Sequence, residues 1–247
     1  MDQRSAEWYQ ARCGRITGTR FAASMAGTDS RTYASLVNEL VSERVTGRCR
    51  ERPITQAMQW GIDHEPVARA WYSRQSGNRV EQVGFVRHRS LGFVGVSPDG
   101  LVGTRGVLEI KCPQEKAYRE TVDRGRIPAR YFWQVQGQLW VCEREFADFV
   151  CFHPRMGGLV FRVQRDEVGI AKLQARCQQV EREVQRQLAS NHSQAVSRPA
   201  PSSAWPKQSV STKTGEQAPH KRHFLPELPW WVWAIAAVVV VLYWLAR

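Results

Sequence analysis

Two carboxylates and a lysine lie close together in the segment SPDGLVGTRGVLEIKCP, residues 97–113. Asp99 and Glu109 repel each other if they converge, unless a cation lies between them. Hard oxygen ligands of this kind favour Mg²⁺ or Mn²⁺. An ammonium from Lys111 could orient or deprotonate an attacking water, or neutralise charge on a phosphoryl oxygen. This is the chemistry of a nuclease, although a surface hairpin with an ordinary Glu/Lys pair has the same spacing.

Two predicted strands must position these side chains. Apolar and polar residues alternate from residue 106 to 112 with the period of a β-strand. Its apolar face is expected to lie in the core, while Glu109 and Lys111 project together from the opposite face. The Ser-Pro-Asp-Gly sequence is a strong turn signal that ends a preceding apolar strand at 93–96. The two strands are expected to form a hairpin that brings Asp99 to Glu109.

A third carboxylate, Glu65, lies in WGIDHEPVARAWYSRQSG, residues 60–77. Apolar residues at helical spacing and a stop at Gly77 predict a helix. Because proline is tolerated mainly near a helix start, Pro66 places Glu65 in a first turn or at a kink. Glu65 is then either a capping acid or a further ligand of the metal site.

Two glutamines, Gln134 and Gln138, share one face of the helix predicted in IPARYFWQVQGQLWVCE, residues 127–143. A glutamine there could position water or a phosphate. The alternative is a solvated position with no role in chemistry.

An arginine and a hydroxyl flank a predicted turn in EWYQARCGRITGTRFAASMAG, residues 7–27. Arg12 and Thr19 lead into a helix of small residues, with Thr17 or Thr19 as its N-cap. A helix amino end with these groups can bind an anion such as a phosphate. Taken alone, the stretch is also consistent with a capped helix and nothing more.

Together these stretches resemble the phage lambda exonuclease family, the YqaJ-type viral recombinases of the PD-(D/E)XK nuclease superfamily. The resemblance extends over about residues 5–188, with the motifs in the family's order and at compatible spacing. The motifs are R-x-G-x-I-T-x-[ST] at 12–19, W-G-x3-E at 60–65, S-P-D-G-L at 97–101, L-E-I-K-C-P at 108–113, Q-V-Q-x2-[ML]-W-V at 134–141 and FHPRMGGLVFRVQRDE at 152–167. Six matches in one chain are far more specific than any one of them.

The resemblance implies a metal-dependent exonuclease that degrades one strand of duplex DNA from its 5′ end and leaves a 3′ single strand for recombination. By the same resemblance, Asp99, Glu109 and the backbone carbonyl of Ile110 ligate the metal, and Glu65 contributes to the metal and water site. The implied cofactor is Mg²⁺, replaceable by Mn²⁺, with two ions per site.

The remaining roles also come from the resemblance. Lys111 would assist the nucleophile, Gln134 would support the site, and Arg12 and Thr19 would hold the terminal 5′ phosphate. The family often has serine where Thr19 stands, which leaves the preference for phosphorylated ends open. The implied partners are double-stranded DNA ends, two further copies in a ring-shaped homotrimer, and a single-strand annealing protein.

Three alternatives remain open on sequence alone: a related PD-(D/E)XK endonuclease, a DNA-end-binding module without catalysis, and a membrane adaptor with a nuclease-like fold. The second would be expected to lack an acid or Lys111, and neither is missing. Cleavage of a covalently closed circle would separate the endonuclease from a strict exonuclease.

Composition agrees with one nuclease domain at residues 1–189 that binds a polyanion. Its net charge is +8, from 29 basic and 21 acidic residues. The six cysteines form no C-x-x-C pair or zinc spacing, and no apolar signal region begins the chain, which indicates a reduced, cytoplasmic domain. An α/β fold of the restriction-endonuclease type is expected, with a mixed central sheet flanked by helices. Helices are predicted at 17–26, 32–46, 56–75, 115–123, 128–142 and 167–189, and strands at 80–87, 92–97, 106–112, 146–153 and 158–165.

The carboxyl-terminal part changes character. Residues 190–229 are rich in Ser, Pro, Gln, Lys and Thr and are expected to form a disordered linker. Residues 230–246 carry no charge and have aromatic residues at both ends. This predicts a transmembrane helix of about 25 Å, with the nuclease domain on the cytoplasmic side because basic residues precede it. A buried core helix or an oligomerisation segment is the alternative.

Overall fold

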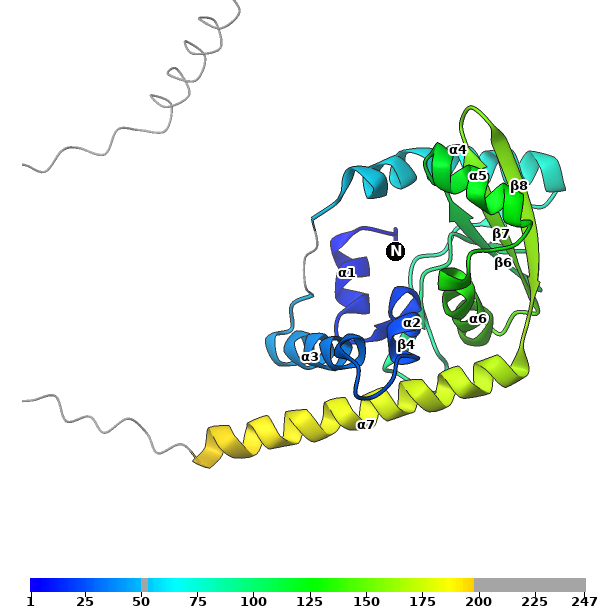
Figure 1. The fold of residues 1–247 in the computed structure, drawn as a ribbon. Helices are drawn as coiled ribbons and strands as arrows, with labels where there is room; N and C mark the ends of the chain where they lie inside the picture. Colours follow the sequence, from blue (N-terminus) through cyan, green and yellow to red (C-terminus); the bar gives the residue numbers. More distant parts are fainter. Residues whose placement is uncertain (50–52, 198–247) are drawn as a thin grey trace, which may run out of the picture. The chain divides into compact units, whose positions relative to one another are not determined.

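The computed structural model describes residues 1–49 and 53–197, with side chains as far as residue 191. Within these residues the larger sheet has five strands and mixed direction (Figure 1). β6 pairs antiparallel with β5 and parallel with β7, which confirms the predicted α/β class with a mixed sheet. The strand order is β2 (Val80–Glu81), β5 (Gly100–Val102), β6 (Gly106–Lys111), β7 (Phe146–His153) and β8 (Gly157–Gln164).

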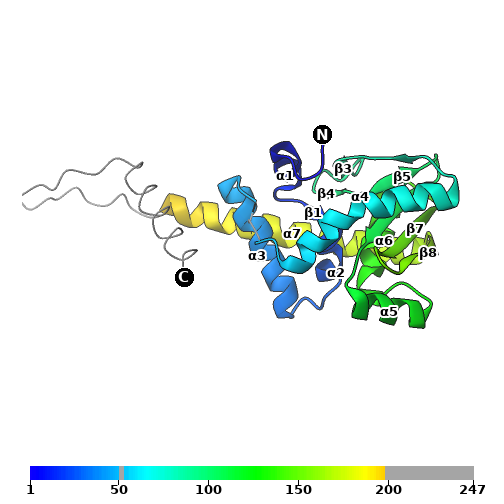
Figure 2. The same cartoon turned by 90° about the horizontal axis from the view of Figure 1, so that it is seen from above.

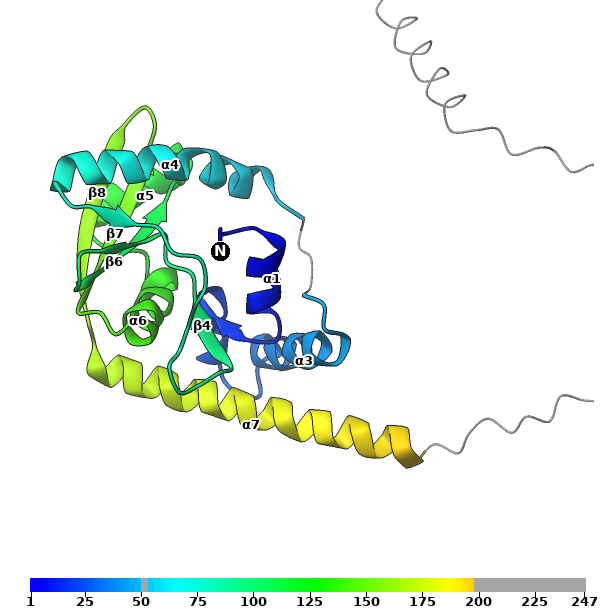
Figure 3. The ribbon, with the colours of Figure 1, turned by 180° about the vertical axis from the view of Figure 1, so that it is seen from behind.

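Helices cover both faces of this sheet, with α4 and α6 on opposite sides of it (Figure 3). On one face, Tyr72 of α4 (Gln56–Ser76) shares an apolar cluster with Leu108 and Ile110. On the other, α5 (Glu115–Arg124) and α6 (Phe132–Val141) contribute to a cluster that contains Val107. The central strand β6 therefore has no solvent-facing side before Lys111.

A smaller sheet lies beside the first and is formed by β1 (Ile16–Thr17), β4 (Val94–Val96) and β3 (Val86–Arg87), in that order. It shares its core with α2 (Phe21–Ser24), α3 (Arg31–Thr46) and α7 (Glu167–Ser197). The short turn η1 (Gly18–Arg20) connects β1 to α2. Seen from above, α7 passes α3 on its way from the sheets (Figure 2). In α7, apolar residues at helical spacing are buried in this core: Ile170, Leu173, Cys177, Val180 and Val184.

Local sequence signals explain where the long helices begin and end. Ser30 and Thr55 accept hydrogen bonds from backbone amides in the first turns of α3 and α4, a contribution of about 1 kcal/mol each. Gly47 and Gly77 end the two helices with φ of 65° and 69°, a conformation that glycine adopts without steric cost.

Several predicted boundaries are wrong. The strand expected at 80–87 is two short strands in different sheets, because the intervening backbone is engaged by the amino-terminal segment, where Gln3 donates to the Val83 carbonyl at 3.0 Å. The helix expected at 17–26 is the 3₁₀ turn η1 followed by the four-residue α2. α1 (Ala6–Arg12) was not expected. The helix expected at 128–142 begins with a 3₁₀ turn, η2 (Ala129–Tyr131).

The predicted hairpin also needs correction. The strand before Asp99, β4, pairs with β1 and β3 in the smaller sheet. The chain then crosses to the larger sheet, where β5 is the hairpin partner of β6. The turn that closes this hairpin lies at 103–105, with Gly103 at φ 53°. Asp99 therefore lies at a crossing between two sheets and not at a hairpin turn.

α7 continues to Ser197, past residue 190 where the linker was predicted to begin. The rest of that predicted linker, from 198 to 229, and the predicted transmembrane helix at 230–246 lie outside the described residues. Among the helices of residues 1–49 and 53–197, none combines the length and the apolar character that crossing a membrane requires.

Candidate active site

Glu109 lies at the centre of the site, on the middle strand of the larger sheet, and its side chain is 1% exposed. It accepts hydrogen bonds from Gln134 Nε2, Gln138 Nε2 and Lys111 Nζ, each at 2.5 Å. The two glutamines come from α6, which packs over this face of β6. A charge buried so deeply requires such donors, because an unpaired carboxylate in the interior is costly.

Gln138 was not predicted as a site residue, and it is 1% exposed. Its Oε1 is buried and has no hydrogen-bond partner among the described residues, while its Nε2 donates to Glu109. The i, i+4 spacing with Gln134 was the available signal. The sequence could not show that this face of α6 lies against β6 and not in solvent.

Asp99 approaches Glu109 from the crossing between β4 and β5. Its backbone N–H donates to the Leu108 carbonyl at 3.0 Å, and its Oδ2 accepts from the Ile110 N–H at 2.6 Å. Burial and the neighbouring charge of Glu109 raise the pKa of Asp99 well above its ordinary value. Asp99 has no ion pair within the described part of the chain.

Lys111 is the cation of the site. Burial favours the neutral amine, but the carboxylates of Glu109 and Asp99 outweigh this and raise the pKa of Lys111. Its Nζ also lies 5.2 Å from the centroid of the Tyr131 ring, within range of a cation–π contact. Lys111 is therefore protonated and acts as a hydrogen-bond donor in this arrangement.

Glu65 lies in the middle of α4 and not in its first turn, because Pro66 is inside the helix. Its two oxygens pair with Arg69 and, at 2.7 Å, with Arg4. Arg69 Nε also donates to the Asp99 carbonyl at 3.1 Å, which connects Glu65 to the site. Glu65 adds to the charge that raises the pKa of Asp99.

The three acids are electrostatic neighbours, but they do not converge on one point. In the described residues, Glu65, Asp99 and Glu109 do not bring one oxygen each to within 4.8 Å of one another. Arginines hold Glu65, and two amides and an ammonium hold Glu109. The convergence of three acids predicted from the sequence is therefore not seen in the described residues. Glu109 is the stronger electrostatic neighbour of Asp99, and Glu65 contributes less.

Arg12, predicted to bind a phosphate, lies at the end of α1. It donates to Ser97 Oγ at 3.1 Å and to Thr17 Oγ1 at 3.4 Å, and it lies 4.2 Å from the Trp8 ring. Burial and the nearby Arg20 lower the pKa of Arg12 to about 10, so it is still charged at neutral pH. No acid forms an ion pair with Arg12 in residues 1–49 and 53–197.

Thr19, the second predicted phosphate ligand, is exposed on η1 and makes no side-chain hydrogen bond to another described residue. The hydroxyl that contacts Arg12 is instead that of Thr17, which is 2% exposed. The two predicted phosphate ligands are therefore Arg12, whose hydrogen-bond partners are neutral, and Thr19, whose hydroxyl has no hydrogen bond among the described residues.

Comparison with known proteins decides the family. The family model described as the YqaJ-like viral recombinase domain matches residues 7–145, more than half of the chain. The chain belongs to this family. The match includes Arg12, Glu65, Asp99, Glu109 and Lys111, and it confirms the resemblance found in the sequence motifs.

Solved structures resemble the YqaJ-like chain over most of its length. It is similar to the alkaline exonuclease LHK-Exo of Laribacter hongkongensis, with 33% identity and a TM-score of 0.74, over 78% of this chain and 98% of that one. The same values hold for LHK-Exo in complex with dAMP. A phage-related exonuclease from Haemophilus somnus is 15% identical, with a TM-score of 0.57, over 72% of this chain and 96% of that one. This last likeness concerns the fold alone.

A curated relative is an uncharacterized protein of Acanthamoeba polyphaga mimivirus, 26% identical over 162 residues. The alignment covers 60% of the YqaJ-like chain. This chain spans only 29% of the length of that relative.

The donor set of the YqaJ-like domain fits a hard divalent cation. Asp99 and Glu109 supply carboxylate oxygens, which Mg²⁺ and Mn²⁺ prefer. Burial and the neighbouring charge of Glu109 both raise the pKa of Asp99, and a cation beside the two acids would offset these effects. The cluster therefore has the ligand type that such an ion requires, and Asp99 is an acid without an ion pair among the described residues.

Proposed function

We propose that this protein is a metal-dependent exonuclease that acts on linear double-stranded DNA from the 5′ end and leaves 3′ single strands for recombination. One observation carries the proposal: Asp99, Glu109 and Lys111 gather at adjoining strands in a chain similar to nearly the whole of an alkaline exonuclease. That relative has also been crystallised with a nucleotide, dAMP.

Asp99 and Glu109 would hold the metal, together with the carbonyl of Ile110, and Glu65 would complete the set, with two ions per site. Mg²⁺ is the proposed cofactor, with Mn²⁺ as a substitute. Such an ion supplies Lewis acidity and an activated water when bound. Binding would require Glu65 to exchange an arginine partner for the ion, since both of its oxygens are paired.

Lys111 and the glutamines have separate roles. Because Glu109 and Asp99 raise its pKa, Lys111 remains an ammonium. Beside a bound metal it would assist the nucleophile, by donating to the attacking water or to a phosphate oxygen or by taking the proton of that water. Gln134 and Gln138 fix the orientation of Glu109, each through one amide hydrogen bond.

Arg12 and Thr19 would bind the terminal 5′ phosphate, which gives the enzyme its direction. Arg12 is partly buried among neutral groups, so an anion would stabilise it. Ser97, which accepts from Arg12, is two residues before Asp99. Two residues of chain span at most about 7 Å. A single DNA end could therefore contact both Arg12 and the metal site.

The experiment that tests the function is a digest of 5′-phosphorylated linear duplex, with each strand labelled separately. With Mg²⁺ we expect loss of the 5′-ended strand only, and no product in EDTA. Covalently closed circular duplex serves as the control substrate. Cleavage of the circle would support an endonuclease instead, and no hydrolysis at any Mg²⁺ or Mn²⁺ concentration would exclude catalysis.

The phosphate role of Arg12 has its own test. Arg12→Ala should reduce the preference for 5′-phosphorylated over 5′-hydroxyl ends about tenfold or more, since a charge-assisted contact contributes roughly 1.5–3 kcal/mol. Arg89→Ala, at an exposed arginine paired with Glu143, is the matched control. Unchanged discrimination in Arg12→Ala would remove the phosphate role and leave the metal site untouched.

We further propose that residues 230–246 anchor the protein in a membrane with the nuclease domain on the cytoplasmic side. The uncharged stretch with aromatic ends supports this proposal. Deletion of residues 224–247 should move the protein from the membrane to the soluble fraction with activity retained. A homotrimer and a single-strand annealing partner follow from the family resemblance and are tested by sedimentation and by co-purification.

A further inference from the structure

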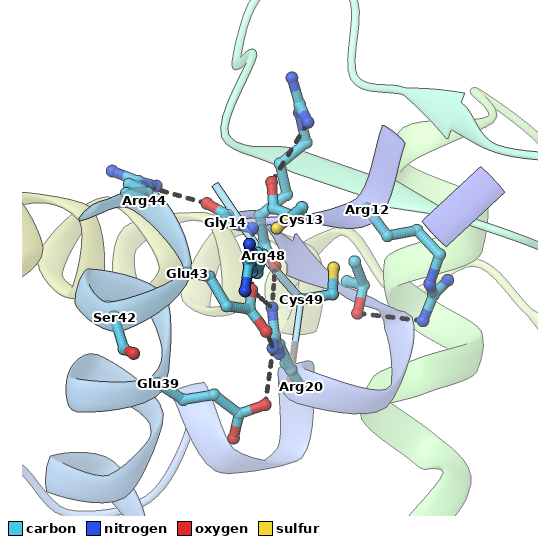
Figure 4. Close-up of polar contacts among 12 residues, drawn as sticks. Arg12, Cys13, Gly14, Arg20, Glu39, Ser42, Glu43, Arg44, Arg48 and Cys49 are labelled. Carbon is cyan, nitrogen blue, oxygen red and sulfur yellow. Dashed lines mark hydrogen bonds and ion pairs between the residues drawn. The ribbon is translucent and has the colours of Figure 1, made fainter. Parts of the chain in front are cut away.

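A second cluster of reactive side chains lies outside the proposed active site. Cys13, Cys49 and Glu43 bring one ligand atom each to within 4.8 Å of one another (Figure 4). Cys13 is the C-cap of α1 and directly follows Arg12. Cys49 follows α3, on the chain that leads into α4. Both thiols are partly exposed, so an external reagent can reach them.

The surroundings of Glu43 disfavour the binding of a metal ion by this cluster. Both oxygens of Glu43 are already engaged: Oε2 accepts from the Gly14 N–H at 2.8 Å, and Arg20 donates to Oε1 and Oε2 at 2.5 and 3.0 Å. A dication would therefore have to displace or approach the Arg20 guanidinium, with a repulsion that Arg12 nearby would increase. The chemistry that remains is between the two thiols, and it forms an uncharged product.

We propose that Cys13 and Cys49 form a reversible disulfide when the protein meets a peroxide or a low-molecular-weight disulfide. Their sulfur atoms already lie within 4.8 Å, and a disulfide needs about 2.05 Å. A small rotation of the side chains or a small shift of the short segment after α3 closes this gap. The bond would tie the end of α1, beside Arg12, to the connection between α3 and α4.

The order of the chemical steps follows from the surroundings of Cys49. Its S–H donates to the Tyr9 carbonyl at 3.2 Å, and burial raises the pKa of Cys49 to about 12. Because the Tyr9 carbonyl holds the Cys49 proton, Cys13 is the sulfur proposed to attack first. With hydrogen peroxide, the Cys13 thiolate cleaves the O–O bond to give a sulfenic acid and hydroxide. The Cys49 sulfur then loses its proton and displaces the hydroxyl as water. Two thiols and one peroxide thus give one disulfide and two waters.

The other four cysteines do not offer a competing pair. Cys112, Cys151 and Cys177 are buried. Cys142, the C-cap residue of α6, is partly buried. Cys112 and Cys151 belong to apolar clusters on opposite faces of the larger sheet. Oxidation is therefore expected to be selective for one pair among six cysteines.

Peptide mapping tests this proposal. The reduced protein, freed of reductant and held with EDTA, is treated with one equivalent of hydrogen peroxide, alkylated and digested after glutamate. Cleavage gives peptides 8–39 and 44–51, which contain one cysteine each. We expect a linked species whose mass is their sum less two hydrogens, and its loss on reduction. The same treatment in urea should give no preference for this pair.

Cys13→Ser and Cys49→Ser should each abolish the linked peptide, whereas Cys142→Ser, the matched control, should leave its yield unchanged. These replacements exchange one atom, and nuclease activity is not needed for the readout, so failure of the proposed function would not affect this test. Alkylation of both peptides after peroxide treatment of the folded protein would overturn the proposal. Equal yields in the folded and urea samples would overturn it as well.

Discussion

Two groups of charged residues in this protein differ in how their charges are balanced. In the paired cluster of Arg20, Glu39 and Glu43, one guanidinium donates to both acids at 2.6 and 2.5 Å, and the glutamates raise the pKa of Arg20 against the effect of burial. Arg12 and Asp99 lack an ion partner among the described residues. Burial lowers the pKa of Arg12 and raises that of Asp99.

Whether a buried charge is paired within the chain distinguishes a structural role from a role in ligand binding. A buried charge that is fully paired within the chain stabilises the fold only while its partner remains, and it has little to offer a ligand. A partly buried charge whose neighbours disfavour ionisation is stabilised when a ligand of opposite charge arrives. Asp99 would gain from a cation, and Arg12 would gain from a phosphate. A DNA end with its metal supplies both.

The largest effect is expected at Lys111. Lys111→Ala removes the ammonium that pairs with Glu109, and we expect the hydrolysis rate to fall about 10²- to 10⁴-fold, because one positioned catalytic group typically contributes that much. Lys116→Ala, at an exposed lysine on α5, should leave the rate unchanged. Single-turnover digestion measures the rate, and fluorescence anisotropy checks that DNA is still bound. A normal rate in Lys111→Ala would assign Lys111 to structure alone.

The paired cluster should respond in the opposite way. Glu43→Gln removes one of the two acids that pair with Arg20, which keeps Glu39, so the free energy of unfolding should fall by about 1.5–3 kcal/mol, the usual contribution of a charged hydrogen bond. Glu143→Gln, at an exposed ion pair with Arg89, should cost about 1 kcal/mol or less. Urea unfolding compares the two. Equal stability of both variants would show that the paired cluster is not a structural element.

Much of this architecture could be predicted from the sequence. Three elements could be assigned from the periodicity of their apolar residues, because this periodicity reflects which face of a strand or helix is buried. They are the strand at 106–112, the helix α4 and the helix α7. The family motifs then indicated Asp99, Glu109 and Lys111, and the structure brings these three together. The prediction that the strand before Asp99 pairs with β6 was wrong: β4 belongs to the smaller sheet, and β5 pairs with β6. The periodicity of a strand shows which face is buried but not which strand it pairs with.

Partners distant in sequence were also beyond prediction. Gln138 was visible as an i, i+4 neighbour of Gln134, but its contact with Glu109 depends on the packing of α6 over β6. The pairing of Arg4 with Glu65 joins residues 61 positions apart. Ser97, 85 positions from Arg12, contacts it where the end of α1 meets the residue after β4, and no local pattern encodes this contact.

A smaller effect is expected on the stability of the metal-free protein. The pKa of Asp99 is higher in the folded than in the unfolded chain, so ionised Asp99 reduces the free energy of unfolding at pH above its unfolded pKa. Asp99→Asn removes this cost and should raise the Tm in EDTA at pH 8 by a few degrees, since about 1 kcal/mol corresponds to roughly 2–4 °C in a domain of this size. The gain should fade as the pH is lowered, because Asp99 is then neutral in both states. A Tm below that of the unmodified protein at pH 8 would contradict the assigned repulsion.

The central claim, that Asp99 and Glu109 form a cation site, is tested most directly by calorimetric titration of Mn²⁺ into the protein without DNA. The account predicts saturable binding that weakens as the pH is lowered, because protons compete with the metal for Asp99, whose pKa is raised. It also predicts at least a tenfold loss of affinity in Asp99→Asn and none in Asp123→Asn, a control at an exposed acid of α5. Equal Mn²⁺ affinity in Asp99→Asn and the unmodified protein would contradict it.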